Sequence, residues 1–371
     1  MAMPSLILLV SPLITYYAAN FLPDVPALCF AIIGFHFFIR YLHRGYRMSD
    51  FIWIIVFSTL AALLKVTAGI IFIAMLFFVF LEGLIARNKK IKWATIPITL
   101  LGIALVMGWL LYVREYNIQG GYFGNLQGLL PAWESDWDTA RYIFLRTKQE
   151  WMPAMMSRKI WILLPLVMVI SIFQFKRLPK HLKYLLPLSL IGTILYLIGW
   201  FKVFDVHDYY IIPAFSFVVM LSYSFISILD NWCSKKWKDI IGVMAMAFII
   251  MGAFHAKKRF EYRATEPNWN SLPTKGFYTV EPYLRSIGID RHKLVHIAPD
   301  PSTNISLYFA NNPGYTRLYG LPPKDAVARG VEYLLIHDSS LLTDSLYLPY
   351  LKHKIGAHKE IQIFKITDEM R

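Results

Sequence analysis

Long apolar runs, interrupted by short polar and basic segments, make up most of the first 255 residues of the chain. An α-helix needs about 20 apolar residues, at about 1.5 Å each, to cross a hydrocarbon core of about 30 Å. The two runs on either side of Lys65 predict a tight helix–turn–helix at one face of the membrane. The candidate spans lie near residues 4–19, 25–42, 50–64, 66–86, 93–113, 160–175, 184–201, 209–229 and 239–255. This pattern predicts an α-helical polytopic membrane protein with about nine transmembrane helices.

The pattern changes after residue 255, where short β-type runs alternate with turn residues and helix-type stretches. The expected strands are 294–298, 333–337 and 361–366, and the expected helices lie near 303–311 and 324–329. We therefore expect two domains. Residues 1–255 form the transmembrane helical domain, and residues 256–371 form a small C-terminal α/β domain.

Composition agrees with a chain that is solvated mainly by lipid. Hydrophobic residues make up 56% of the 371, the mean hydropathy is +0.45, and only 17% of residues are charged. A soluble protein would have about 25% charged residues. The net charge of +14 does not predict a nucleic-acid partner, because the basic residues lie in short clusters between apolar runs. Cys29 and Cys233 predict neither a disulfide framework nor a thiolate metal site.

The basic clusters occupy alternate loops, which orients the chain in the membrane. Cytoplasmic loops carry an excess of Lys and Arg. One set of loops contains Arg40, Arg44, Arg47, Arg87, Lys89, Lys90, Lys92, Lys176, Arg177, Lys180, Lys183, Lys235, Lys236 and Lys238. The short loops of the opposite set contain only Lys65 and Lys202. We expect the first set and the N-terminus in the cytoplasm, and the C-terminal domain outside, at a bacterial inner membrane.

The long loop 114–159 lies on the outer side in this topology. It is rich in aromatic residues, among them Trp133, Trp137 and Trp151, and it contains a Gly-Gly pair at 120–121. Aromatic side chains are enriched at membrane–water interfaces. The loop is therefore expected to contain juxtamembrane helices that lie in the interface.

Three polar groups lie at the outer ends of spans. Asp24 follows Pro23 and has two interpretations: an N-cap for the next helix, or a carboxylate at the water–lipid boundary that is available to a metal, a sugar hydroxyl or a proton. Lys65 is either a snorkelling lysine or an ammonium that holds a lipid phosphate. The segment 202–210 is either an aromatic belt with Asp208 as an N-cap or an anion-binding rim.

No catalytic triad, zinc spacing, Walker loop or dinucleotide fingerprint accompanies these groups. No metal ligand set can be assigned from the sequence, although a divalent metal is compatible with the carboxylates.

Four segments together resemble the GT-C superfamily of polytopic glycosyltransferases. They resemble above all the bacterial relatives of protein O-mannosyltransferases and of the aminoarabinose transferase that acts on lipid A. The segments are Ser11-Pro12-Leu13 through Pro23-Asp24, Leu63-Leu64-Lys65, His207-Asp208-Tyr209-Tyr210-Ile211-Ile212-Pro213, and Asp300 through Phe309 in the C-terminal domain. Their order agrees with the topology derived from charge.

The resemblance implies hexosyl or pentosyl transfer from a polyprenyl-phosphate donor to an envelope glycan, lipid or protein at the outer face of the membrane. Carried over to this chain, Asp24 is the supporting acid and Lys65 contacts the donor phosphate. Lys202 and His207 are further expected phosphate contacts, and Asp208 and Tyr209 complete the expected substrate-binding set.

One feature departs from the family pattern. Family members carry a catalytic Asp on a large first outer loop, whereas no acidic residue precedes Asp24 here. The first span and first outer loop of the family are therefore expected to be missing from this sequence. Either the sequence is truncated, or the chain works beside a partner that supplies the missing part, or it is not an enzyme, and we expect the chain alone to be inactive. A translocator of lipid-linked sugars and a membrane scaffold with an envelope-binding domain are the alternative functions. The absence of an internal repeat disfavours the translocator.

Overall fold

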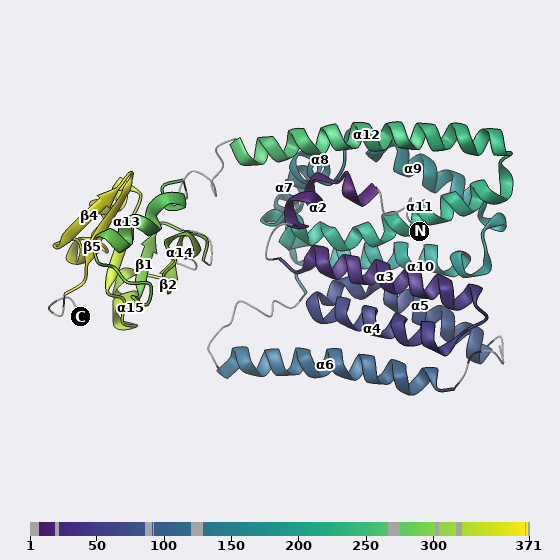
Figure 1. Cartoon of the computed structure of the whole chain (residues 1–371), viewed down its shortest axis with the longest axis horizontal. Coiled ribbons are helices and arrows are strands. Elements are labelled where there is room, and N and C mark those ends of the chain that lie inside the picture. Colours follow the sequence, from purple (N-terminus) through teal and green to yellow (C-terminus); the bar gives the residue numbers. More distant parts are fainter. Residues whose placement is uncertain are drawn as a thin grey trace. The chain divides into compact units, whose positions relative to one another are not determined.

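The computed structural model describes residues 7–18, 22–85, 91, 93–119, 129–265, 275–300, 304–316, 321–367 and 369. These residues form two compact units, Met1–Glu261 and Tyr262–Arg371, which are described separately. The first is helical and the second contains a small sheet (Figure 1), which confirms the fold class expected from the sequence.

The first unit consists of α-helices joined by short 3₁₀ and π segments. Its elements are α2 (Pro12–Ala18), α3 (Asp24–His43), α4 (Met48–Leu64), η1 (Val66–Gly69), α5 (Ile70–Phe80), η2 (Leu81–Ile85), α6 (Thr95–Gln119), η3 (Ala132–Glu134), α7 (Trp137–Arg146), η4 (Thr147–Trp151), α8 (Met152–Met155), α9 (Arg158–Phe173), η5 (Phe175–Arg177), α10 (Lys180–Gly199), η6 (Phe201–Asp205), η7 (Asp208–Ala214), α11 (Phe215–Trp232) and α12 (Lys235–Thr265). The last helix extends ten residues beyond the domain boundary expected at residue 255.

Six helical segments in the described part of the chain are long and apolar enough to cross a membrane. They are Asp24–His43, Val66–Leu84, Thr95–Gln119, Lys180–Gly199, Asp208–Trp232 and Lys235–Arg263. A seventh candidate is the pair Trp137–Met155 and Arg158–Phe173, which is bent by 95°, and α4 is a shorter apolar helix. These segments coincide with every expected span except the first.

The expectation of a continuous first span is wrong for residues 7–18. The chain is helical at 7–9, breaks at Ser11, and resumes as α2. Proline disfavours the α conformation in the residue before it and fits the first position of a helix. Ser11 Oγ then accepts a hydrogen bond from the amide of Ile14 at 3.3 Å, so Ser11 caps the short helix that follows.

The antiparallel helices α3 and α4 pack closely because small residues line their contact. A buried cluster joins Ala27 and Ala31 of α3 to Ala61 of α4. Further along the same stripe, a Cβ added to Gly34 would lie 2.9 Å from Ser58 Oγ. Residues spaced by three or four lie on one face of a helix, so this stripe also turns Asp24 toward the end of α4.

The ends of the helices are segregated by charge. The turns after α3, α9 and α11 lie together at one end of the bundle, at the right of Figure 1. We call it the basic end; its cations in these turns and the adjacent helix starts are Arg44, Arg47, Lys176, Arg177, Lys180, Lys235 and Lys236. The α4–η1 junction, η6, η7, α2 and α7 lie at the opposite end. Within the described residues the expected alternation of basic loops is thus present, while residues 86–90 and 92 lie outside them.

Two long helices, α6 and α12, have almost no buried surface in the unit. In the 18-residue apolar stretch of each candidate span, only 6% is buried for α6 and 11% for α12, against 67% for the segment that contains α11. Helix α6 contacts α4 at Gly102, where an added Cβ would lie 2.8 Å from Ile55 Cγ2 and from Thr59 Oγ1. Apolar helices so little covered by protein require lipid around them.

The second unit is a five-stranded mixed sheet with helices on it. Its elements are η8 (Phe277–Thr279), α13 (Val280–Ser286), β1 (Val295–Ala298), α14 (Ile305–Ala310), β2 (Gly314–Thr316), α15 (Pro323–Ala328), β3 (Tyr333–Ile336), η10 (Ser339–Leu342), η11 (Leu348–Tyr350), β4 (Lys354–His358) and β5 (Ile361–Lys365). The strand order is β2-β1-β3-β5-β4, with β1 parallel to β2 and β3, and β5 antiparallel to β3 and β4. The three expected strands and both expected helices are present, although residues 301–303 lie outside the described part.

The two faces of this sheet have separate cores, as the two-residue period of a strand requires. Leu335 and Ile363 face a cluster with α13 and α14. Their neighbours Leu334 and Phe364 face a second cluster with α15 and residues 341–351. Both faces are therefore covered.

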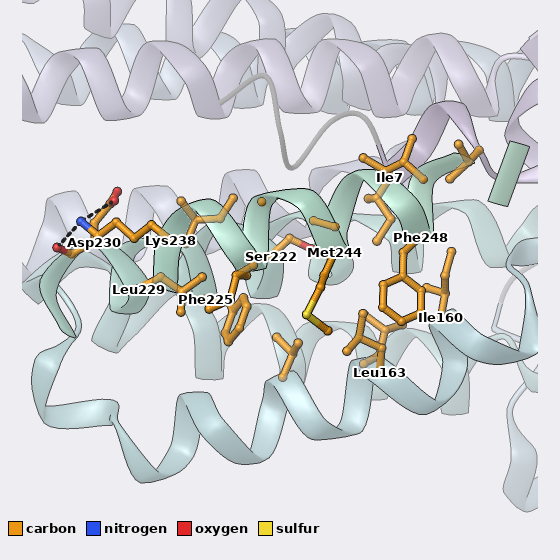
Figure 2. A pocket seen from close by; sticks show the side chains of 18 residues that line it. Ile7, Ile160, Leu163, Ser222, Phe225, Leu229, Asp230, Lys238, Met244 and Phe248 are labelled. Atoms are coloured by element: carbon orange, nitrogen blue, oxygen red, sulfur yellow. Dashed lines mark hydrogen bonds and ion pairs between the residues drawn. The ribbon is translucent and has the colours of Figure 1, made fainter. Parts of the chain in front are cut away.

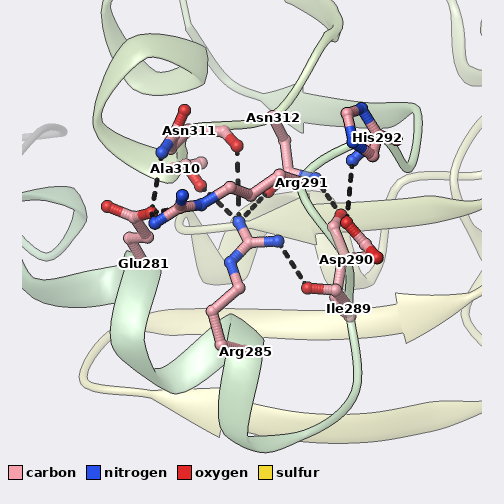
Figure 3. A network of polar contacts seen from close by, with 9 residues as sticks. All are labelled: Glu281, Arg285, Ile289, Asp290, Arg291, His292, Ala310, Asn311 and Asn312. Carbon is pink, nitrogen blue, oxygen red and sulfur yellow. Dashed lines mark hydrogen bonds and ion pairs between the residues drawn. The ribbon is translucent and has the colours of Figure 1, made fainter.

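Arg285 of α13 ties three chain segments of this unit together (Figure 3). Its guanidinium donates hydrogen bonds to the carbonyl oxygens of Ile289 at 2.5 Å and Ala310 at 2.9 Å, and to Asn312 Oδ1 at 2.5 Å. Asn311 ends α14 in a left-handed conformation with φ of 50°. Arg285 thus satisfies backbone acceptors at the end of α14 and in the turn before β1, which accounts for it as a structural residue.

Candidate functional site

Asp24 and Lys65 meet at the end of the α3–α4 hairpin that lies opposite the basic end. Lys65 Nζ is 3.1 Å from Asp24 Oδ1. The Asp24 side chain is 1% exposed and that of Lys65 is 19% exposed. The carboxylate is therefore shielded while the ammonium still reaches the surface.

The local backbone explains why Lys65 can turn toward α3. Lys65 is extended, with φ of −152° and ψ of 109°, and separates α4 from η1. Its amide still bonds to Ala61 O of α4 at 2.9 Å, and its carbonyl accepts from the amide of Ala68 at 2.9 Å. The β-branched residues Val66 and Thr67 that follow disfavour continuation of α4.

The interpretation of Asp24 as an N-cap is wrong. Pro23 occupies the cap position, Asp24 is the first residue of α3, and no side-chain cap bond is made there. The reason is the lysine, which draws the carboxylate sideways toward the α4 end. Asp24 Oδ2 is buried and receives no hydrogen bond from another residue in the described part of the chain. One carboxylate oxygen thus pairs with Lys65, and the other is buried without a hydrogen bond from a described residue.

Two aromatic rings from η7 lie beside the ammonium. Lys65 Nζ is 4.3 Å from the ring centroid of Tyr210 and 5.5 Å from that of Tyr209. The His207 ring stacks on Tyr209 at 5.0 Å, and the two tyrosine rings stack at 4.8 Å. The segment 207–210 is distant from Lys65 along the chain but forms one wall of the same site. Cations are attracted to aromatic faces.

Asp208 is not an N-cap either. It is the first residue of η7, and His207 takes the cap position without a side-chain cap bond. Instead, Asp208 Oδ1 accepts a hydrogen bond from Tyr17 Oη of α2 at 2.7 Å. The two residues are far apart in the sequence, so this contact fastens α2 over the site.

Sequence reasoning missed Tyr17 and also Tyr196 of α10. The Tyr196 hydroxyl donates to the carbonyl oxygen of Tyr210 and so fixes the backbone that carries the ring beside Lys65. Tyr196 is almost fully buried within an apolar span. A buried tyrosine hydroxyl needs a hydrogen-bond partner, and that requirement is the only signal by which the sequence could have suggested it.

His207 belongs to the segment that forms one wall of the site, and it lies between two candidate spans. Its burial lowers its pKa below the ordinary value, Asp208 acts in the opposite direction, and Lys65 adds to the lowering. The ring is therefore neutral at pH 7. A neutral imidazole presents one donor and one acceptor, which suits a sugar hydroxyl better than a phosphate.

Lys202 has a different neighbour from Lys65. Its Nζ lies 3.5 Å from Glu134 Oε2, and its amide donates to the carbonyl of Leu130 at 3.0 Å. These contacts attach residues 130–134 of the long outer loop to η6. None of the contacts that join Asp24, Lys65 and 207–210 involves Lys202, so its assignment to the phosphate remains a prediction.

Helix α7 and the following η4 also attach to η6 at this end. Trp151 Nε1 donates to the carbonyl of Phe204 at 2.7 Å, and Arg146 lies 3.3 Å from Asp205. The pair α7–α8 is bent by 95° from α9. If α9 is perpendicular to the membrane, α7 lies along its surface. Trp133 and Trp137 are strongly exposed, as an interfacial position requires, while residues 120–128 of the loop lie outside the described part.

No group of three or more His, Cys, Asp or Glu side chains that could hold a metal occurs in the part of the chain that the structure describes. At the site itself, Asp24 already pairs with Lys65 and Asp208 with Tyr17. The described residues thus give no ligand set from which a metal-dependent step can be derived.

Comparison with known families gives a match over the first part of the chain, to a family of membrane glycosyltransferases of the GT-C type. Residues 2–112 match the family model of the dolichyl-phosphate-mannose-protein mannosyltransferases, which is a GT-C superfamily domain. The match confirms the GT-C resemblance and covers Asp24 and Lys65, but not the segment 202–210. Comparisons with curated proteins and with solved structures gave no match.

Proposed function

We propose that this chain takes part in the transfer of a sugar from a polyprenyl-phosphate donor to an envelope acceptor at the outer face of the membrane, with the catalytic base supplied by a partner. The observation that carries the proposal is the contact between Asp24 and Lys65 beside the rings of Tyr209 and Tyr210. A membrane-boundary site suits this reaction because the donor's tail is soluble in lipid while its sugar is soluble in water.

Lys65 supplies positive charge for the leaving phosphate. The acceptor's hydroxyl oxygen bonds to the sugar's anomeric carbon and loses its proton to the catalytic base, while the bond between that carbon and the phosphate oxygen breaks. Negative charge then develops on the phosphate, and a fixed cation stabilises it. The Lys65 ammonium has three donors, so it can hold phosphate without leaving Asp24. In this proposal Asp24 holds the Lys65 ammonium at the membrane boundary, next to the place where the donor phosphate binds.

In this proposal the second carboxylate oxygen of Asp24 interacts with the molecule that receives the sugar. A buried hydrogen-bond acceptor without a donor costs on the order of 1–3 kcal/mol. A hydroxyl of the molecule that receives the sugar would donate to this oxygen and remove that cost. Asp24 is thereby a supporting acid that orients the acceptor. His207, Asp208 and Tyr209 line the sugar side. Lys202 pairs with Glu134, so in this proposal Lys65 alone carries the phosphate contact.

The orientation follows from the charge of the loops. We propose that the basic end faces the cytoplasm of a bacterial cell, with the N-terminus inside, and that the Asp24–Lys65 end faces the periplasmic side of the inner membrane. Helix α12 begins at the basic end, and a single crossing would carry residues 256–371 to the outer side. We then propose that the C-terminal domain lies in the periplasm, the same compartment as the envelope acceptor.

Transfer assays with sealed vesicles of known orientation test both function and sidedness. The donor is a short-chain, water-soluble polyprenyl-phosphate sugar that does not cross the bilayer, offered as a series of hexoses and pentoses. We expect label to enter envelope acceptors in right-side-out vesicles only. Transfer only in inverted vesicles would overturn the orientation. Passage of a long-chain donor across the bilayer without any transfer would instead support a translocator.

A further inference from the structure

An elongated apolar groove lies between α9, α11 and α12, away from Asp24 and Lys65 (Figure 2). Its volume is about 420 Å³, and ligand pockets in proteins measure about 300–1,000 Å³. Most of its lining is aliphatic or aromatic, and Leu163, Phe225, Met244 and Phe248 represent it in Figure 2. Hydrocarbon therefore suits the groove better than a sugar does.

The polar groups of the groove are confined or already satisfied. Ser222 lines its middle, but its hydroxyl donates to the carbonyl of Val218 at 2.8 Å within the same helix. The remaining polar side chains, Asp230 and Lys238, lie together at one extremity (Figure 2). That extremity is the basic end of the bundle, since these residues flank the turn between α11 and α12.

Helix α12 is held to the bundle at two levels, with the groove between them. At the basic end, Lys238 Nζ lies 2.9 Å from the carbonyl oxygen of Asp230 and 3.3 Å from its carboxylate. At the other end, His255 Nε2 lies 2.8 Å from the carbonyl oxygen of Pro153. At 1.5 Å per residue these attachments are roughly 26 Å apart, close to the thickness of a hydrocarbon core. Because the groove runs along α12 between these attachments, it is parallel to the lipid chains that surround a membrane-spanning helix.

We propose that the groove binds one acyl chain of a phospholipid from the leaflet at the basic end, with the lipid phosphate at Lys238. The Lys238 side chain is 35% exposed, and its ammonium has a third donor beyond the two oxygens of Asp230. Lys235, Lys236 and the nearby Arg177 make the surrounding surface positive, which attracts an anionic headgroup. The lipid would fill a seam that α12 alone leaves open.

The glycines of α6 and α12 provide a matched pair of variants. A Cβ added to Gly242, which lines the groove, meets nothing within 4 Å, and the same is true of Gly108 on α6. Gly242→Phe should therefore fill the groove without a backbone clash, whereas Gly108→Phe adds the same side chain outside it. Ala245→Leu provides a second filling variant if Gly242→Phe fails to fold.

Native mass spectrometry of the purified full chain, incubated with phosphatidylglycerol or with diacylglycerol of the same chains, tests the proposal. Wild type and Gly108→Phe should retain one phosphatidylglycerol. The fraction of Gly242→Phe protein that carries this lipid should be at least tenfold lower. Lys238→Gln should lower retention of phosphatidylglycerol to the level of diacylglycerol. Equal retention by the two phenylalanine variants, or equal retention of the two lipids by wild type, would overturn the proposal.

Discussion

Replacing Lys65 by methionine should lower the rate of sugar transfer by at least about a hundredfold, which corresponds to about 2.7 kcal/mol in the barrier. Methionine keeps the length of the side chain and removes the charge that stabilises the leaving phosphate. Asp24→Asn should lower the rate by more than about tenfold, or about 1.4 kcal/mol, because it removes the carboxylate that positions Lys65. Both rates are measured with a polyprenyl-phosphate sugar and extracted membranes.

Loss of activity must be separated from loss of folding, because Lys65→Met leaves a buried carboxylate without its partner. Removing one member of a buried pair costs on the order of 3–5 kcal/mol. The double variant Lys65→Met with Asp24→Asn is neutral and should recover most of that stability, but no transfer. A double variant that recovers activity as well would show that the pair is structural only.

Lys202→Met is the matched control for these variants. Lys202 lies at the same end of the bundle, but its ammonium pairs with Glu134 rather than with Asp24. The rate of transfer should change by less than about threefold, because exposed pairs contribute little. A Lys202→Met variant as slow as Lys65→Met would instead place both lysines on the phosphate.

Arg285→Ala should reduce the stability of the C-terminal unit on the order of 3 kcal/mol. The substitution removes the donor for the carbonyls of Ile289 and Ala310 and for Asn312 Oδ1, and hydrogen bonds to a charged group are worth about 1.5–3 kcal/mol. The measurement is urea unfolding of residues 262–371. We expect this segment to fold alone because both faces of its sheet have their own cores.

The control lies in the same network (Figure 3). Arg291 pairs with Glu281 at 2.8 Å, but its side chain is 62% exposed. Arg291→Ala should therefore leave the unfolding midpoint almost unchanged. Equal losses from the two alanine variants would contradict the structural role assigned to Arg285.

The sequence predicted the helices and singled out Asp24 and Lys65, because both depend on strong local signals. Long apolar runs identify spans, and an ionisable residue at the end of a span is costly enough to attract notice. Asp24 and Lys65 both met this criterion, and the α3–α4 hairpin unites them because residues 24 and 65 occupy its open end. The break at Ser11 escaped notice, although Pro12 beside it was a visible signal.

Contacts between distant segments could not be predicted in this way. The bond from Tyr17 to Asp208 and that from Tyr196 to Tyr210 depend on how four elements pack, and nothing local distinguishes these tyrosines from interfacial ones. The cap interpretation of Asp24 failed for the same reason, since a local rule was overridden by a lysine forty residues away. Strands β2 and β4 were missed because β2 has only three residues and β4 is largely exposed.

Binding of a polyprenyl monophosphate, without its sugar, tests the central claim most directly. The protein is placed in lipid nanodiscs, and the dissociation constant is measured for wild type, Lys65→Arg and Lys65→Met. We predict that arginine preserves binding within about tenfold, since it keeps the charge, and that methionine weakens it by at least a hundredfold. An unchanged dissociation constant for Lys65→Met would contradict the assignment of this site to the donor phosphate.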